Sequence, residues 1–288
     1  MSYRTALKDL VKRNQLLSVP GIFDLISAKI ADGMGFPVLY MTGYGTVASH
    51  LGLPDAGLAT YTDMVGRIER ICASTQALLI ADGDTGYGGL LNVRHTVRGY
   101  EAAGAAAIQL EDQEFPKKCG HLPGRRVVAI EAMVRKIEVA VEARSNPDFL
   151  IIARTDARTT LGLDEALRRG KAYVAAGADI LFIESPESEA EMSEICRSFD
   201  VPLLSNMVEG GRTPVLSADR LTKLGYSIAL FPATGFLTAA AALRAAYQTL
   251  RDHGSSVALN VPMYDFKEFS LLMGFQDVMD FERMHPEE

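Results

Sequence analysis

The feature that most constrains this chain is a regular alternation of short apolar runs with longer stretches of helical periodicity. Eight runs are nearly continuous in Val, Ile, Leu and Ala, which is typical of parallel strands buried on both faces. Several of the intervening stretches end in Ala-Gly or Leu-Gly, as expected where a glycine follows a helix C-terminus. The predicted strands are Leu16–Pro20, Val38–Thr42, Ala77–Asp82, Ala106–Glu111, Phe149–Arg154, Ile180–Glu184, Leu203–Asn206 and Ile228–Phe231. The predicted helices are Asp24–Met34, Tyr61–Ser74, Val93–Ala103, Ile130–Arg144, Asp164–Ala176, Glu187–Phe199, Ala218–Leu224 and Thr234–Leu250.

Eight strand–helix units predict an α/β protein of the closed (β/α)8 (TIM) barrel type, not an open doubly wound sheet. No G-x-G-x-x-G follows the first strand, which argues against a dinucleotide fold. No Ser/Pro-rich linker divides the chain, so we predict one domain over residues 1–288, with 262–288 as a C-terminal helical extension. The amphipathic stretch Tyr264–Met284 is surplus to the barrel. We expect it to pack on the barrel surface or on a neighbouring subunit, which favours an oligomer.

The composition excludes several classes of partner. A formal net charge of −7 argues against nucleic acid, whose binding needs clustered Lys and Arg. No apolar run approaches the roughly 20 residues of a membrane span, and the N-terminus lacks the apolar core of a secretory signal. Cys72, Cys119 and Cys196 are widely spaced and form no C-x-x-C pair, so neither a disulfide framework nor a structural zinc site is expected. These features predict a cytoplasmic protein.

Polar residues gather where the predicted strands end, and in (β/α)8 barrels these C-terminal ends form the active site. They are Tyr40, Thr42 and Tyr44 at the second strand, Asp82 and Asp84 at the third, Glu111 and Asp112 at the fourth, Arg154 and Asp156 at the fifth, Glu184 at the sixth and Asn206 at the seventh. A purely structural role gives no reason to collect charged and amide side chains at one mouth. This convergence therefore predicts an active site there.

Asp82 and Asp84 are two positions apart, so on an extended chain their carboxylates point the same way. With Glu111 from the neighbouring strand they form a cluster of oxygen ligands, which suits Mg²⁺ or Mn²⁺ better than zinc. The alternative is a capped loop with solvated acids. Arg154 is suited to clamp a substrate carboxylate in a bidentate manner, and its alternative is an ion pair with Glu184 or Asp156.

The segment from Ile108 to Arg126 leads from the fourth strand into a polar loop. Its glycines supply the flexible positions that a closing lid needs, so we predict a mobile catalytic lid. We interpret Cys72 and Cys196 as small buried hydrophobes on helices. Cys119 has basic neighbours able to tune a thiol, so we predict a functional role for it, with packing as the alternative. The residues that define the loop are Lys117, Lys118, Cys119, Gly120, His121 and Gly124.

Six segments carry a resemblance to a known superfamily: TGYGTVASHLGLPDAGL, ADGDTGYG, IQLEDQ, KKCGH, IIARTDA and NMVEGGRTP. Over nearly its whole length the chain resembles the isocitrate lyase/phosphoenolpyruvate mutase superfamily, and KKCGH after an EDQ strand is the signature of the carbon–carbon lyase branch. The resemblance implies a (β/α)8 barrel whose last helix is swapped with a neighbouring subunit. It also implies a homo-oligomer, here a dimer of dimers.

The resemblance further implies roles for individual residues. Asp82 and Asp84 match the acids of a Mg²⁺ site, to which Glu111 contributes through water. The substrate-binding positions are matched by Thr42, Gly43, Tyr44, Asp55, Gly120, Arg154, Glu184 and Asn206. Cys119 matches the proton donor and Tyr40 matches a proposed base. As further catalytic residues we propose Lys117 and His121, which would stabilise the developing carboxylate charge, and Glu111.

Two departures from the superfamily pattern narrow the substrate. The 2-methylisocitrate lyases read N-I-T after the seventh strand and carry an Arg after the eighth, where this chain has Asn206-Met207-Val208 and Leu237. One cationic anchor fewer implies a dicarboxylate, and NMVEGG resembles the dimethylmalate lyase, oxaloacetate hydrolase and petal death protein group. The phosphonate-forming mutases carry an Asn-containing loop in place of Cys119-Gly120-His121, which disfavours chemistry at a phosphorus–carbon bond.

The expected activity is therefore Mg²⁺-dependent cleavage of a substituted malate, of the 2,3-dimethylmalate type, to an α-keto acid such as pyruvate and a carboxylic acid. The alternatives, in order, are oxaloacetate hydrolysis to oxalate and acetate, 2-methylisocitrate cleavage, and carboxyphosphoenolpyruvate or phosphonopyruvate chemistry. A barrel that has lost catalysis and serves in binding or assembly is a different class of function. The intact acids and lid sequence disfavour it.

Overall fold

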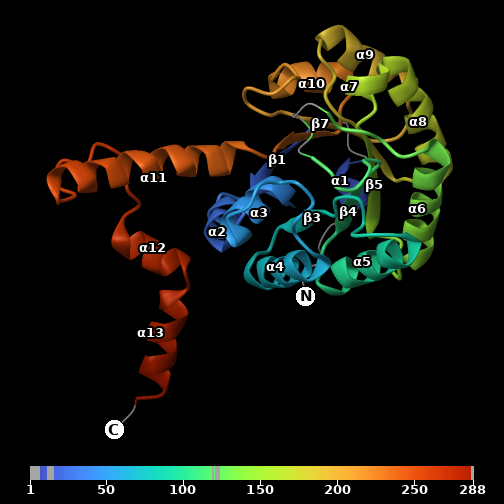
Figure 1. Cartoon of the computed structure of the whole chain (residues 1–288). Helices are drawn as coiled ribbons and strands as arrows, with labels where there is room; N and C mark the ends of the chain where they lie inside the picture. Colours follow the sequence, from blue (N-terminus) through green and yellow to red (C-terminus); the bar gives the residue numbers. More distant parts are fainter. Residues whose placement is uncertain (1–6, 12–15, 119, 121–123, 287–288) are drawn as a thin grey trace.

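The computed structural model describes residues 7–11, 16–118, 120 and 124–286. At its centre is a closed barrel of eight parallel strands, each paired with the next along the chain, with β8 closing onto β1 (Figure 1). The prediction of a (β/α)8 barrel is confirmed. The strands are β1 (Leu17–Ile22), β2 (Val38–Met41), β3 (Leu78–Asp82), β4 (Ala107–Glu111), β5 (Leu150–Thr155), β6 (Ile180–Ile183), β7 (Leu203–Asn206) and β8 (Ile228–Phe231).

Helices connect the strands and surround the barrel, and several begin at a side-chain cap. Asp24 and Thr60 accept the N–H of the third helical residue at the starts of α2 and α4, and Ser188 and Ser217 do so at α9 and α10. The helices are α1 (Leu7–Val11), α2 (Leu25–Gly33), α3 (Gly43–Leu51), α4 (Tyr61–Ser74), α5 (Leu90–Ala102), α6 (Ile130–Ala143), α7 (Arg158–Leu161), α8 (Leu163–Ala175), α9 (Glu189–Ser198), α10 (Ala218–Leu224), α11 (Thr234–His253), α12 (Phe266–Leu272) and α13 (Phe275–Met284). In the described part of the chain, none of them is long and apolar enough to span a lipid bilayer.

Two apolar layers explain why the strand sequences are almost continuously hydrophobic. One cluster fills the barrel interior, where Leu7 and Val11 of α1 are buried among side chains from the beginnings of the strands. The other lies between the strands and the surrounding helices. Successive strand residues alternate between the two layers, so both faces are buried. The register of β4 against β5 sets Glu111 beside Arg154, which places an acid and a base together at the mouth.

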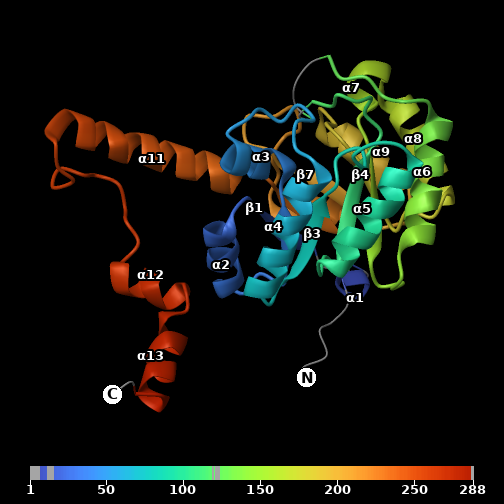
Figure 2. The same cartoon turned by 60° about the horizontal axis from the view of Figure 1, so that its bottom comes forward.

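The C-terminal arm, residues 234–286, projects away from the barrel (Figures 1 and 2). The eighth predicted helix forms where expected, but all of α11 is described and none of its residues is buried. Its beginning touches β1, and α12 returns to touch α2. The amphipathic stretch predicted after it forms two helices, because Gly274, with φ of 98°, ends the first and begins the second.

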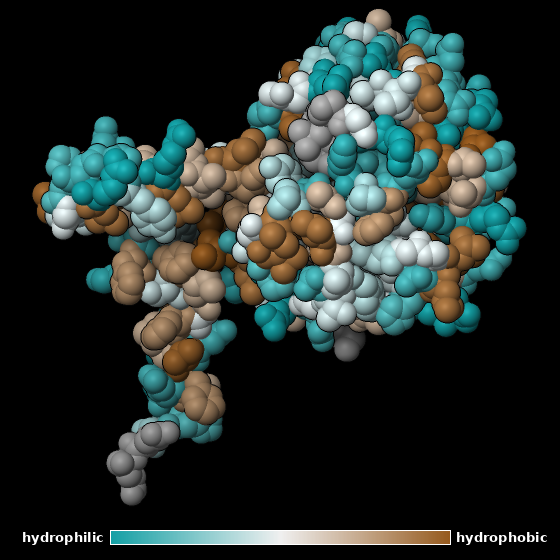
Figure 3. All heavy atoms as spheres, in the orientation of Figure 1, coloured by the Kyte–Doolittle hydropathy of each residue, from teal (hydrophilic) through white to brown (hydrophobic). Residues whose placement is uncertain are grey.

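Large apolar side chains remain exposed along this arm. Figure 3 shows hydrophobic surface along the arm and at the place where the arm leaves the barrel. The exposed residues are Leu237, Leu243, Tyr247, Leu250, Val257, Met263, Tyr264, Phe266, Leu271, Met273, Phe275, Val278, Met279, Phe281 and Met284. Exposed apolar surface of this kind is typical of a contact with another chain.

Candidate active site

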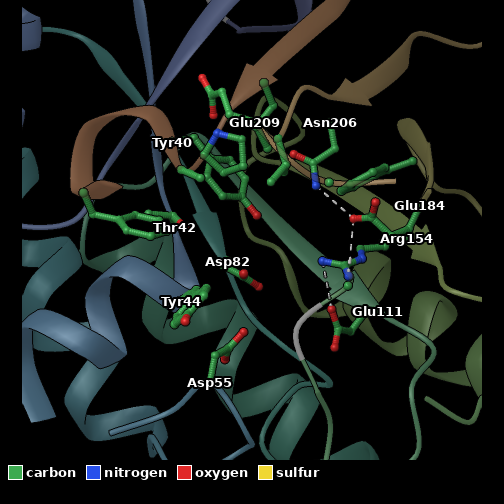
Figure 4. A pocket seen from close by; sticks show the side chains of 18 of the residues that line it. Tyr40, Thr42, Tyr44, Asp55, Asp82, Glu111, Arg154, Glu184, Asn206 and Glu209 are labelled. Atoms are coloured by element: carbon green, nitrogen blue, oxygen red, sulfur yellow. Dashed lines mark hydrogen bonds and ion pairs between the residues drawn. The ribbon is translucent and has the colours of Figure 1, made fainter. Parts of the chain in front are cut away.

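The C-terminal ends of the strands surround a cavity of about 230 Å³ (Figure 4). Most of its polar lining comes from β2 to β7 and the lid, and its apolar wall comes largely from β8 and the beginning of α11. The polar lining residues are Tyr40, Thr42, Tyr44, Asp55, Asp82, Glu111, Lys117, Lys118, Arg154, Glu184, Asn206 and Glu209. The apolar ones are Phe182, Val208, Leu230, Pro232, Ala233, Phe236 and Leu237. Most of the polar residues that the sequence places at the strand ends therefore meet around one cavity, whereas Asp84, Asp112 and Asp156 are not among its lining residues.

Asp82 and Asp84 lie at the end of β3 in a tight turn. The N–H of Asp84 donates to Oδ1 of Asp82 over 3.0 Å, and Asp84 itself has a φ of 48°. Gly43 lets β2 approach closely, because a Cβ at this position would lie 2.6 Å from Oδ2 of Asp82. Burial, and then the negative charge of Asp84, raise the pKa of Asp82 to about 6. A cation beside this carboxylate would offset both effects.

Glu111 provides the third acid from the end of β4. Its Oε2 lies 3.2 Å from Nη1 of Arg154 on the neighbouring strand. Burial raises the pKa of Glu111 well above its usual range, although the charge of Arg154 acts in the opposite direction. Its Oε1 is buried and has no hydrogen-bond partner among the described residues, so that oxygen is available to a ligand or a water molecule.

These acids fit a hard divalent cation that is held largely through water. Among the described residues, no three His, Cys, Asp or Glu side chains converge closely enough to enclose a metal ion by themselves. Mg²⁺ usually keeps several water ligands and is bound through one or two carboxylates together with substrate oxygens. Asp82 and Asp84 supply such carboxylates, and the unpartnered Oε1 of Glu111 supplies an acceptor for a bound water.

Arg154 is the cationic centre of the cavity (Figure 4). Its Nη2 lies 2.9 Å from Oδ1 of Asp156 and 3.4 Å from Oε2 of Glu184, to which Nδ2 of Asn206 also donates over 3.0 Å. Both ion pairs considered as the alternative to a clamp are present. The side chain nevertheless lines the cavity, so these pairs orient the guanidinium toward a ligand.

In the segment predicted as a lid, the described residues on either side of positions 119–123 form two arms, 112–118 and 124–128, that pair with each other. An antiparallel bridge joins Gln113 to Val127. The side chain of Gln113 also brackets Lys118, accepting its backbone N–H over 3.0 Å and donating to its carbonyl oxygen over 2.9 Å. The base of the lid is therefore braced by its own hydrogen bonds.

Lys117 is the lid residue whose side chain contacts the acid cluster. Its Nζ forms an ion pair with Asp55 and lies 2.6 Å from Oδ1 of Asp84. Burial lowers the pKa of Lys117, but the charges of Asp84, Glu111 and Asp55 outweigh burial and hold that pKa well above its usual range. The side chain is therefore an ammonium group, and it lines the cavity.

Gly120 lies directly over the cationic centre. A Cβ at this position would overlap Nη2 of Arg154 and would lie 2.9 Å from Oε2 of Glu184. Only a residue without a side chain fits there with the lid in this position. The predicted catalytic residues Cys119 and His121 lie outside the described residues.

Tyr40 reaches the acid cluster through Gln109, a residue to which the sequence analysis assigned no role. The hydroxyl of Tyr40 donates to Oε1 of Gln109 over 2.7 Å, and Nε2 of Gln109 lies 3.4 Å from Oδ1 of Asp82. Burial, followed by the charge of Asp82, raises the pKa of Tyr40 well above its usual range. In the sequence, Gln109 could have been identified as a site residue because it is an amide inside an otherwise apolar strand.

Thr42, Gly43 and Tyr44 lie where β2 runs directly into α3, a helix that the sequence analysis did not predict. Thr42 and Tyr44 line the cavity. The ring of Tyr44 packs against Phe236 at the beginning of α11, with 5.3 Å between the ring centroids. These predicted substrate-binding residues therefore lie next to the apolar wall.

A buried carboxylate beneath the mouth was also assigned no role. Asp112 accepts hydrogen bonds from Thr155 and Tyr173 over 2.7 Å each and from Arg169 over 3.0 Å. It also accepts the N–H of Asp156 over 2.9 Å. Asp112 therefore fixes the end of β5, on which Arg154 is mounted. In the sequence, Arg169 and Tyr173 could have indicated a buried acid, because they lie four positions apart on the buried face of α8.

Comparisons with known proteins agree with this geometry. A family model described as phosphoenolpyruvate phosphomutase matches residues 7–251. The 2,3-dimethylmalate lyase of Eubacterium barkeri is 48% identical over 282 residues, which cover 98% of each chain. A solved oxaloacetate acetylhydrolase, in complex with the inhibitor 3,3-difluorooxalacetate, is 35% identical with a TM-score of 0.93, covering 98% of this chain and 97% of the other. A phosphonopyruvate hydrolase solved with oxalate and Mg²⁺ is 30% identical with a TM-score of 0.89, and both chains are fully covered.

Proposed function

The chain belongs to the phosphoenolpyruvate phosphomutase family, and we propose that it is a Mg²⁺-dependent carbon–carbon lyase acting on a 2-hydroxy dicarboxylate. The substrate would be a substituted malate of the 2,3-dimethylmalate type, cleaved to pyruvate and propionate. The observation that carries the proposal is the division of the cavity into an acidic and cationic side and an apolar wall. The first side suits the carboxylates and the 2-hydroxyl group, and the second suits the alkyl substituents.

The distribution of cations supports a dicarboxylate over a tricarboxylate. The cationic residues that line the described cavity are Lys117, Lys118 and Arg154, from the lid and β5. The opposite wall presents Phe236 and Leu237 at the beginning of α11. A third carboxylate directed at that wall would lose its hydration without gaining a partner.

Asp82 and Asp84 would hold the divalent ion, with Glu111 acting through water, and Mn²⁺ would be accepted by the same oxygen ligands. When bound, the ion supplies stabilisation of negative charge on the 2-oxygen and the adjacent carboxylate. Arg154 would bind a substrate carboxylate. Its contacts with Glu111 and Glu184 hold the guanidinium group in an orientation suited to this role. The other proposed substrate contacts are Thr42, Gly43, Tyr44, Asp55, Gly120, Glu184 and Asn206.

Cleavage breaks the C2–C3 bond as the 2-hydroxyl group loses its proton, which Glu111 would take up through a water molecule held at its unpartnered Oε1. The bonding electrons pass to C3 and form the enolate of the second carboxylate. The thiol of Cys119 would give its proton to C3, and Lys117 and His121 would stabilise the negative charge on that carboxylate. Tyr40 was the proposed base, but its O–H donates to Gln109 and burial raises its pKa. We propose instead that the phenol oxygen accepts the hydrogen bond of the substrate hydroxyl group and orients it.

Oxaloacetate hydrolysis is the second candidate. It is favoured by the close structural agreement with a solved oxaloacetate acetylhydrolase. The reaction adds water to the keto group of oxaloacetate and then breaks the same C2–C3 bond, giving oxalate and acetate. It needs the same acids and the same lid. The two candidate substrates therefore differ in the group that would lie against the apolar wall.

The test is product analysis by NMR with the complete chain and Mg²⁺. Racemic 2,3-dimethylmalate, oxaloacetate and 2-methylisocitrate are supplied separately, with EDTA controls. We expect pyruvate and propionate from the first, carrying one deuterium at C2 of propionate when the reaction runs in D2O. Oxalate and acetate from oxaloacetate alone would favour the second candidate. Absence of products from all three would reject lyase and hydrolase alike.

We also propose that a second copy of the chain covers the C-terminal arm, as part of a dimer of dimers. The arm exposes apolar side chains such as Leu243 and Tyr247, and Ser18 on β1 is exposed where a barrel strand is normally covered by a helix. An exchanged α11 would cover both surfaces. Light scattering of a Leu243→Asp/Tyr247→Asp variant should show a smaller assembly than wild type, and an unchanged mass would contradict the exchange.

A further inference from the structure

Arg125 is a buried charged residue that the mechanism above does not use. It stands at the C-terminal end of the lid, where its side chain is 1% exposed. The next residue, Arg126, is 77% exposed and pairs with Glu114 on the other arm of the lid. Burial of a guanidinium group costs free energy unless the group is paired, because it loses its hydration. Arg125 therefore needs a partner.

The partner of Arg125 is also the partner of Arg154. Nη1 of Arg125 forms an ion pair with Oδ1 of Asp156, and Nη2 donates to Oγ1 of Thr159 over 2.5 Å. The same Oδ1 lies 2.9 Å from Nη2 of Arg154. Asp156 is fully buried, and its backbone N–H donates to Asp112, which fixes the backbone that carries the shared carboxylate.

The charge balance around Arg154 gives the pair a consequence for binding. Arg154 contacts Glu111, Glu184 and Asp156, which is one cation among three carboxylates. If Asp156 depended on Arg154 alone, the guanidinium would be drawn toward that acid and away from the cavity. Arg125 supplies the second positive charge. Burial raises the pKa of Asp156, but Arg154 and Arg125 together hold that pKa below its usual value.

We propose that Arg125 is a positioning residue for the substrate clamp. It neutralises Asp156, so that this acid offsets less of the positive charge of Arg154 and the guanidinium stays oriented toward a substrate carboxylate. It also attaches the C-terminal end of the lid to the segment that follows β5. The position of the lid and the orientation of Arg154 are therefore coupled. This inference rests on the proposed function, in which Arg154 binds a carboxylate of the substrate.

The test measures oxalate binding by calorimetry in the presence of Mg²⁺, along with KM and kcat for the substrate that wild type cleaves. Arg125→Met should weaken oxalate binding and raise KM by roughly tenfold or more, with a smaller effect on kcat. Arg126→Met is the matched control and should bind oxalate as wild type does. Arg125→Lys retains the charge and should retain most of the affinity.

A double variant separates charge balance from a general structural role. In Arg125→Met/Asp156→Asn the acid that needs neutralising is absent, so oxalate affinity should return to within about threefold of wild type. A folded double variant that still binds roughly tenfold more weakly would overturn the inference, as would a tenfold loss in Arg125→Lys or wild-type affinity in Arg125→Met. If Arg125→Met does not fold, the double variant and Arg125→Lys decide. Wild type that binds no oxalate would instead reject the carboxylate site itself.

Discussion

Replacing Gly120 with alanine tests whether the position of the lid over Arg154 is the reactive arrangement. The added methyl group would overlap Nη2 of Arg154 and lie 2.9 Å from Oε2 of Glu184, whereas ordinary contacts begin at 3.4 Å. Neither neighbour is free to withdraw, because Arg154 is bound to Asp156 and Glu184 accepts from Asn206. The lid must therefore lift by about 1 Å, and a displacement of this size costs on the order of 100-fold in rate.

A 100-fold loss corresponds to about 2.7 kcal/mol of transition-state stabilisation. It should appear in kcat for 2,3-dimethylmalate cleavage, measured by coupling pyruvate release to lactate dehydrogenase. Melting temperature should change little, because the methyl group is accommodated once the lid lifts and the barrel core is not altered. Gly66→Ala is the matched control: its Cβ would meet nothing within 4 Å on α4, and we expect wild-type turnover.

Full activity in Gly120→Ala would refute the reasoning. It would mean that the chemistry proceeds with the lid displaced from Arg154 and Glu184, and that the close approach is not part of the reactive state. A variant that is slow but also melts far below wild type would contradict the argument in another way, because it would place Gly120 in the stability of the barrel.

The remaining predictions concern the thiol, the apolar wall and the acid cluster. Cys119→Ser should reduce turnover by about 100-fold or more, because a hydroxyl is a much weaker acid, while calorimetry still detects oxalate binding with Mg²⁺. Undiminished turnover would remove the thiol from the mechanism. Leu237→Arg should shift the ratio of kcat/KM values toward 2-methylisocitrate by roughly tenfold, and Leu237→Met should not. Asp82 has a folded-state pKa of about 6, above its ordinary value of 3.8, so its contribution to stability is complete below 3.8 and is lost as the pH rises through 6. In EDTA the melting temperature of wild type should therefore fall relative to Asp82→Asn between pH 5 and 7, and Mg²⁺ should restore it; parallel curves for the two proteins would contradict the shift.

The barrel could be predicted from the sequence because its strands are buried on both faces. Burial on both sides requires continuous apolar runs, and each run then marks one strand whatever the loops do. The position of the site could also be predicted, because the last residues of the parallel strands all lie at one end of the barrel. Asp82, Glu111 and Arg154 meet there as predicted.

The helix α3 could not be predicted in the same way. It begins within the tetrapeptide TGYG, whose glycines disfavour a helix by local propensity. Gly43 and Gly45 are required by neighbours distant in sequence: a Cβ on Gly45 would lie 2.8 Å from Phe23 and from Phe236. The second TGYG forms a turn instead, with positive φ at Gly86, Tyr87 and Gly88. Tertiary packing therefore decides the conformation of this tetrapeptide.

The buried pair of Arg125 and Asp156 shows a further limit of reasoning from sequence. Successive side chains on an extended segment point to opposite sides, so one of two adjacent arginines at the end of the lid must face the barrel. Which one does so depends on how the two arms of the lid are paired, and the bridge between Gln113 and Val127 fixes that register. A shift of one residue would turn Arg126 inward and leave Arg125 in solvent. The charge available to the substrate clamp thus depends on a backbone register that no local pattern specifies.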